Sequence, residues 1–170
     1  MRLYRGKVEP ISQEIIEQLR ASGAAEIDDA VEARLDVEAV LKEYLRLDRE
    51  VVDEAKNRLE IRGLGYSHLG RTKAQVAKER GAPPQDDVLP YLVEQIVNIL
   101  FHSNHVAEIF AEDAEIRKQL TPILRKHMEV DTDLDREVRS KIKNLEEGTS
   151  DFEIEYARVM GQMKQRKRLE

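Results

Sequence analysis

The chain repeats a five-residue sequence: it reads Leu47-Asp48-Arg49-Glu50-Val51 and, 87 positions later, Leu134-Asp135-Arg136-Glu137-Val138. At the same offset, the pair Lys56-Asn57 matches Lys143-Asn144. Both stretches place apolar residues four positions apart among charged ones, which is typical of a solvated amphipathic helix. A repeat over this distance predicts two related helical units in one chain.

The sequence around the first copy predicts one helix of about 30 residues. Apolar residues recur at helical spacing from Val37 to Leu59. Asp29 and Glu32 form a capping arrangement at the start, and Gly63 follows Arg62 at the end. Similar stripes occupy most of the chain, so we expect an all-α protein of about seven or eight helices. An upstream match, Ile15–Leu19 against Leu92–Ile96, lies at an offset of 77.

Gly81-Ala82-Pro83-Pro84-Gln85 is the clearest break in the helical pattern. Two consecutive prolines hold the chain extended and cannot continue a helix. We therefore expect a first helical unit over residues 1–82 and a second over residues 86–170, joined by the segment 81–85. The two units form either one shared core or two separate cores.

Three finer expectations concern the second unit. No run alternates in the manner of a strand, so Val106, Ile109 and Phe110 are assigned to a short helix or turn. Ser150 and Glu153 form a second capping box. The helix that Ser150 opens is expected to pack onto the preceding one, with Gly148 allowing a sharp turn between them. The contacting residues would be Phe152, Tyr156 and Val159 on one helix and Leu134, Val138 and Ile142 on the other.

Composition restricts the class of protein. Charged residues make up 36% of the chain and aromatic residues 5%, which favours long solvated helices. Without cysteine there is neither a disulfide framework nor a thiolate metal site. No apolar signal region follows the basic start, and no apolar stretch is long enough to span a bilayer. The net charge of −6 counts against a general nucleic-acid binder. We expect a cytoplasmic protein that does not contact membranes.

A metal site is one candidate function. His102 and His105 lie three residues apart and would share a helix face, with Glu108 following at helical spacing. Two imidazoles and a carboxylate can hold zinc and leave a position open for hydrolysis. The alternative role of histidines near a helix end is to satisfy the free carbonyls of the last turn.

Nucleic-acid binding is a second candidate. Basic residues gather in residues 71–80 and again at the end of the chain, where they could contact phosphate groups. Cations in a last helical turn are equally expected from the helix dipole. The candidate contacts are Arg71, Lys73, Lys78, Arg80, Lys164, Arg166, Lys167 and Arg168.

Several stretches resemble one family across essentially the whole chain. They include Met1–Tyr4, Leu100–Asn104, Phe110–Asp113 and Pro122–Met128, and the most specific is Ile142–Thr149 followed by Glu155-Tyr156. These stretches resemble the bacterial family catalogued as domain-of-unknown-function family five-hundred-and-seven. Phe152 stands where the resemblance leads us to expect tryptophan. The resemblance implies a bacterial cytoplasmic setting and no activity, cofactor or catalytic residue.

The sequence contains no cysteine and no serine in a nucleophile-elbow context, so covalent catalysis has little support. Together with long, charged, well-capped helices, this favours a non-enzymatic interaction module without a cofactor and with a protein partner. The nucleic-acid-associated protein is the first alternative, and a metal-dependent enzyme at His102 and His105 is the second.

Overall fold

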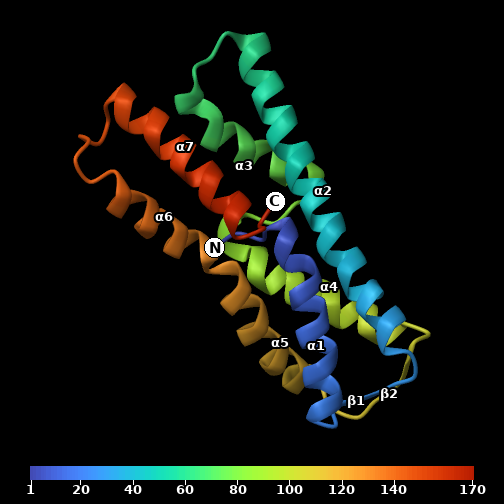
Figure 1. The fold of residues 1–170 in the computed structure, drawn as a ribbon. Coiled ribbons are helices and arrows are strands. Elements are labelled where there is room, and N and C mark those ends of the chain that lie inside the picture. The colour runs from blue at the N-terminus through green and yellow to red at the C-terminus, as the bar shows by residue number, and fades with distance from the viewer.

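The computed structural model describes all 170 residues and confirms the predicted all-α class. Figure 1 shows a helical bundle from which two helical arms diverge. Short 3-10 turns at Arg5–Lys7, Tyr66–His68 and Gln85–Asp87 lead into helices. The remaining elements are α1 (Val8–Ala21), β1 (Ala25–Ile27), α2 (Ala30–Arg62), α3 (Leu69–Arg80), α4 (Val88–His102), β2 (Val106–Ile109), α5 (Asp113–Met128), α6 (Val130–Lys141) and α7 (Ser150–Arg166).

Local sequence signals set both ends of α2. The Asp29 carboxylate accepts a hydrogen bond from the backbone N–H of Glu32 at 3.1 Å, which satisfies a free donor of the first turn. Gly63 ends the helix in the left-handed region, with a φ of 64°. The predicted helix of about 30 residues is therefore confirmed. Its first half lies in the bundle and its second half extends into an arm (Figure 1).

The bundle consists of α1, the first half of α2, α4 and α5. Its single continuous core combines residues on both sides of the Pro83-Pro84 break, so the two predicted units do not have separate main cores. The largest fully buried side chains of this core include Ile11, Leu41, Ile96 and Leu124. Pro122 lies inside α5 without ending it.

Each arm has a small core of its own. The first arm, residues 46–82, packs α3 against the second half of α2 around Val51, Ala55 and Val76. The second arm, residues 130–169, packs α7 against α6. The expected packing of the closing helix is confirmed: Phe152 and Val159 are buried and Tyr156 is partly buried with Leu134, Val138 and Ile142. The cap of α7 is Thr149 rather than Ser150, with its side chain accepting from Phe152 N at 3.3 Å.

One expectation about secondary structure is wrong. Residues 106–109 form strand β2, which pairs antiparallel with β1 so that Glu26 lies opposite Glu108. The assignment to a helix or turn failed because strands of three and four residues are too short to display a period of two. Their stability comes from a partner about 80 residues away in the sequence, which no local pattern reports.

The two halves of the chain run through the same order of elements: helix, short strand, long helical segment, closing helix. α1 packs on α2 as α4 packs on α5. The three residues that form the first arm's core cluster each have a buried counterpart 87 positions later, whereas the buried Leu59 corresponds to the exposed Glu146. The pairs are Val51 and Val138, Ala55 and Ile142, and Val76 and Met163.

The ends of α3 and α7 also match at an offset of 87. After α3, Gly81 N–H donates to Lys78 O and Ala82 N–H donates to Ala77 O. After α7, Arg168 N–H donates to Gln165 O and Leu169 N–H donates to Lys164 O. Gly81 has a φ of 70°, and Arg168 is the one non-glycine residue with a positive φ, 53°. The two closing helices thus end with the same hydrogen-bond pattern.

Candidate functional site

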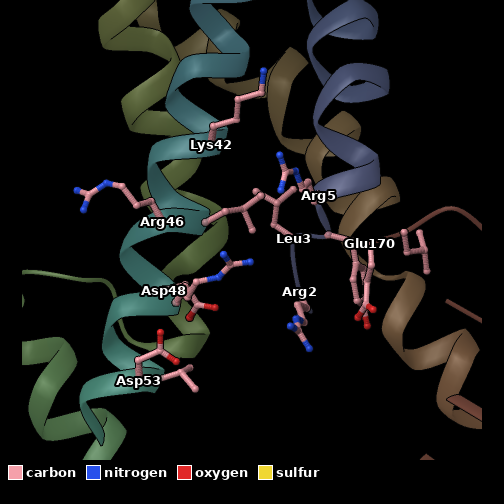
Figure 2. A pocket seen from close by; sticks show the side chains of 13 residues that line it. Arg2, Leu3, Arg5, Lys42, Arg46, Asp48, Asp53 and Glu170 are labelled. Atoms are coloured by element: carbon pink, nitrogen blue, oxygen red, sulfur yellow. The ribbon is translucent and has the colours of Figure 1, made fainter. Parts of the chain in front are cut away.

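A pocket of about 700 Å³ lies where the two arms leave the bundle. Figure 2 shows the N-terminal segment and the C-terminal residues on one side and the middle of α2 on the other. Three segments far apart in the sequence therefore build it. The lining residues are Arg2, Leu3, Tyr4, Arg5, Lys42, Leu45, Arg46, Asp48, Arg49, Val52, Asp53, Leu169 and Glu170.

Close contact between the two chain ends holds one wall of this pocket in place. Gly6 N–H donates to the carbonyl oxygen of Leu169 at 2.9 Å, and Leu169 is buried in the second arm's core. A Cβ on Gly6 would overlap the carbonyl oxygen of Arg168 and lie 2.9 Å from the Cα of Leu169. On the other side, Arg2 N–H donates to Met128 O at 3.0 Å, which ties the segment to the end of α5.

The pocket carries more positive than negative side chains. Its five cations are Arg2, Arg5, Lys42, Arg46 and Arg49, and its three acids are Asp48, Asp53 and Glu170. In a chain of net charge −6, this is a local reversal of sign. Such a lining can bind a partner through ion pairs and hydrogen bonds, with guanidinium groups suited to carboxylates and phosphates.

Not all of these cations are neutralised within the chain. Lys42 pairs with Glu38 at 2.9 Å, and Arg46 pairs with Glu43 and Glu50. The other three pocket cations, Arg2, Arg5 and Arg49, form no ion pair. Figure 2 shows Arg46 pointing away from the pocket, whereas Arg2 lies across from Asp48 and Asp53. Arg49 is thus the member of α2 best placed to meet an acidic partner.

Two tyrosines beside the pocket are shielded from solvent. Burial raises the pKa of Tyr4, which also has the Arg2 guanidinium 5.1 Å from its ring centre. Burial likewise raises the pKa of Tyr44, with a further contribution from the charge of Asp48. Both phenols stay protonated well above neutral pH, so they contribute apolar surface and a hydroxyl donor rather than a charge.

The candidate metal ligands do not converge. His102 is the last residue of α4, and its Nδ1 lies 2.7 Å from Asn98 O. Its side chain thus hydrogen-bonds a backbone carbonyl of the last helical turn. His105 lies beyond the helix, so the prediction that the two histidines share a helix face is wrong. Glu108 is on β2, opposite Glu26. No three His, Asp or Glu side chains gather in a geometry that could hold a metal ion.

The candidate nucleic-acid contacts fall into two groups, on α3 and at the end of α7. Three of the eight are engaged by acids. Arg80 pairs with Glu50 at 2.9 Å, and Lys167 pairs with Glu137 at 3.1 Å. The base and the acid of the second pair each lie 87 positions after those of the first. Lys164 pairs with Glu170 at 3.3 Å. The remaining five, which form no ion pair, are Arg71, Lys73, Lys78, Arg166 and Arg168.

The residues of the pocket were not singled out from the sequence, because each looks ordinary in its own segment. Arg49 lies on a charged helix face that is expected to be solvated. Two features of the sequence relate to the pocket: the basic segment Met1–Lys7, and Leu169, a single apolar residue among charged neighbours. Neither reveals that the two chain ends meet beside α2.

No helix of the protein combines the length and the apolar character needed to cross a bilayer. A comparison with curated proteins gives no significant match. The model of one family matches residues 1–169, nearly the whole chain, and confirms the resemblance seen in the sequence. The chain therefore belongs to the family described as protein of unknown function DUF507.

Proposed function

We propose that this protein is a non-enzymatic helical interaction module whose docking surface is the pocket between the arms. The observation that carries the proposal is the lining of that pocket: an open space of about 700 Å³ with five cations, of which only Lys42 and Arg46 have an acid partner within the chain. An acidic segment of a protein partner would supply the missing carboxylates. A bacterial cytoplasmic setting is part of this proposal and rests on the family resemblance.

We further infer that the two halves arose by duplication of one helical unit. Three independent matches at an offset of 87 support this: the LDREV sequence, the buried positions of the arm cores, and the hydrogen bonds that end α3 and α7. Ala33, Val37 and Leu41 match buried residues at a smaller offset, 83. The difference of four residues falls near Glu129, between α5 and α6, where the second half has about one extra turn of helix.

The duplication gives the proposed module its shape. Two similar hairpins leave one bundle (Figure 1). The pocket is lined by residues from the beginning of the first hairpin and from the end of the second. A partner placed there would be contacted from both sides, which raises the contact area without a deep cavity. Sequences of other family members test the duplication, since the same offsets should recur between their halves. Halves that match at no common offset would contradict it.

A pull-down from native lysate tests the docking surface, using the wild-type chain and two charge-reversal variants. Arg49→Glu reverses an unpaired cation inside the pocket. Lys118→Glu reverses an exposed, unpaired cation on α5, and serves as the matched control. We expect the partner captured by the wild type to be lost with Arg49→Glu and kept with Lys118→Glu.

Two results would argue against the proposal. Equal capture by both variants would show that the pocket is not the docking surface. Capture that disappears after nuclease treatment would favour the nucleic-acid-associated alternative, which predicts strong dependence on salt. Circular dichroism of each variant verifies that the helices are intact, so that loss of capture reports the surface and not unfolding.

A further inference from the structure

The turn ends of the two arms are equivalent in the fold but opposite in charge. From Ile61 to Lys78, eighteen residues include four bases and no acid. From Asn144 to Glu155, twelve residues include five acids and no base. We name residues 61–73 the basic tip and residues 144–155 the acidic tip. Figure 1 places them at the far ends of α2–α3 and of α6–α7, away from the bundle.

The basic tip exposes apolar side chains together with free cations. Ile61 is 76% exposed and Tyr66 is 75% exposed, and Leu64 is exposed beside them. Arg62, Arg71 and Lys73 form no ion pair within the chain. Exposed apolar groups surrounded by unpaired charges of one sign are typical of a surface that meets a partner of the opposite sign.

The acidic tip has the complementary character. Ile154 is 65% exposed. Glu147 pairs with Arg139, and Glu155 pairs with Arg158 at 2.8 Å. Glu146, Asp151 and Glu153 have no ion pair, so three carboxylates are free at this tip. Each tip thus offers three unpaired charges next to exposed aliphatic surface, and the charges are of opposite sign.

We propose that the basic tip of one copy binds the acidic tip of a second copy of this chain. Both complementary surfaces are present on the same molecule, so a second copy supplies a match for each tip. A lipid surface with anionic headgroups would match the basic tip only and would repel the acidic one. The contact is head-to-tail, so an assembly of two copies still has one unoccupied tip at each of its ends. Further copies can add there to form chains, or the two ends can bind each other to close a ring.

Sedimentation velocity of the full chain over a range of concentrations tests this proposal. We expect the average mass of the wild type to rise with concentration. The rise should weaken roughly tenfold or more when the salt is raised from about 0.1 M to about 1 M, because the Debye length falls from ~10 Å to ~3 Å.

Charge reversal identifies the surfaces. Arg71→Glu with Lys73→Glu makes the basic tip negative, and Glu146→Lys with Glu153→Lys makes the acidic tip positive. Each double variant alone should stay monomeric, and an equimolar mixture of the two should associate again, since opposite tips are then restored between the variants. Arg20→Glu with Lys118→Glu is the matched control for the basic-tip variant, because it lowers the net charge by the same amount on exposed, unpaired cations of the bundle. This control should associate as the wild type does.

Three results would overturn the proposal. They are a wild type that stays monomeric at every concentration, reversal variants that associate as well as the wild type, and a mixture that does not recover association. Flotation with vesicles containing phosphatidylserine is measured in parallel. A monomeric wild type that binds these vesicles, and loses binding with Arg71→Glu and Lys73→Glu, would assign the basic tip to a lipid surface instead.

Discussion

Replacing Gly6 by alanine should separate the two ends of the chain and open the pocket between the arms. The new Cβ would overlap the carbonyl oxygen of Arg168, a backbone atom that cannot rotate away. Either the N-terminal segment or residues 168–170 must move. Movement of the C-terminal residues removes Leu169 from the second arm's core and breaks its hydrogen bond with Gly6.

The structure sets the size of the effect. Leu169 is 1% exposed, and complete burial of a leucine side chain contributes about 1.5–3 kcal/mol. The hydrogen bond from Gly6 N–H to Leu169 O contributes about 0.5–1.5 kcal/mol. If both interactions are lost, the free energy of unfolding falls by about 2–4.5 kcal/mol, since the two contributions add to that range.

Urea unfolding monitored by circular dichroism measures this loss, with Gly161→Ala as the matched control. Gly161 lies within α7, and a Cβ there would meet nothing within 4 Å. That variant should gain about 0.5–1 kcal/mol from the higher helix propensity of alanine. In a Leu169→Ala background, Gly6→Ala should cost much less, because the side chain it displaces is already gone.

A loss below about 1 kcal/mol for Gly6→Ala would refute this reasoning, because typical core contributions are larger. It would mean that the last residues shift at little cost and that Leu169 does not anchor the wall of the pocket. Equal losses for Gly6→Ala in both backgrounds would also contradict the mechanism, since the two positions would then act independently.

Two further predictions concern the second arm. Phe152 is 7% exposed, so Phe152→Ala should lower the free energy of unfolding, measured in urea, by about 3–5 kcal/mol. Phe110, outside this arm, is 60% exposed and serves as the control: Phe110→Ala should lower the same free energy by less than about 0.5 kcal/mol. A small loss at Phe152 would show that α7 is not docked on α6. Burial, and the hydrogen bond to Asp135, raise the pKa of Tyr156 from 10.0 to about 12. Folding thus favours the protonated phenol, so the stability that this shift provides is complete below pH 10 and is lost as the pH rises through about 12. Tyr156→Phe should remove this pH dependence, and identical slopes for both proteins between those pH values would disprove it.

The sequence by itself determined where most helices begin and end, because the signals are local. α2 begins with a hydrogen bond between Asp29 and Glu32, which lie three positions apart in the sequence. Gly63 and Gly81 end helices because glycine adopts a positive φ without steric cost. The apolar stripes of α6 and α7 also identified the faces that pack together, since a period of 3.6 residues places Leu134 and Val138 on one side.

Only the tertiary structure decided how distant segments meet. β1 and β2 are too short to be recognised alone, and each is stabilised by pairing with the other at one end of the bundle (Figure 1). The pocket depends on Gly6 approaching Leu169, more than 160 positions away in the sequence. Arg168 ends its helix with a positive φ, where the sequence offers no glycine to mark the turn. These features depend on long-range packing, which fixes positions that local propensity leaves open.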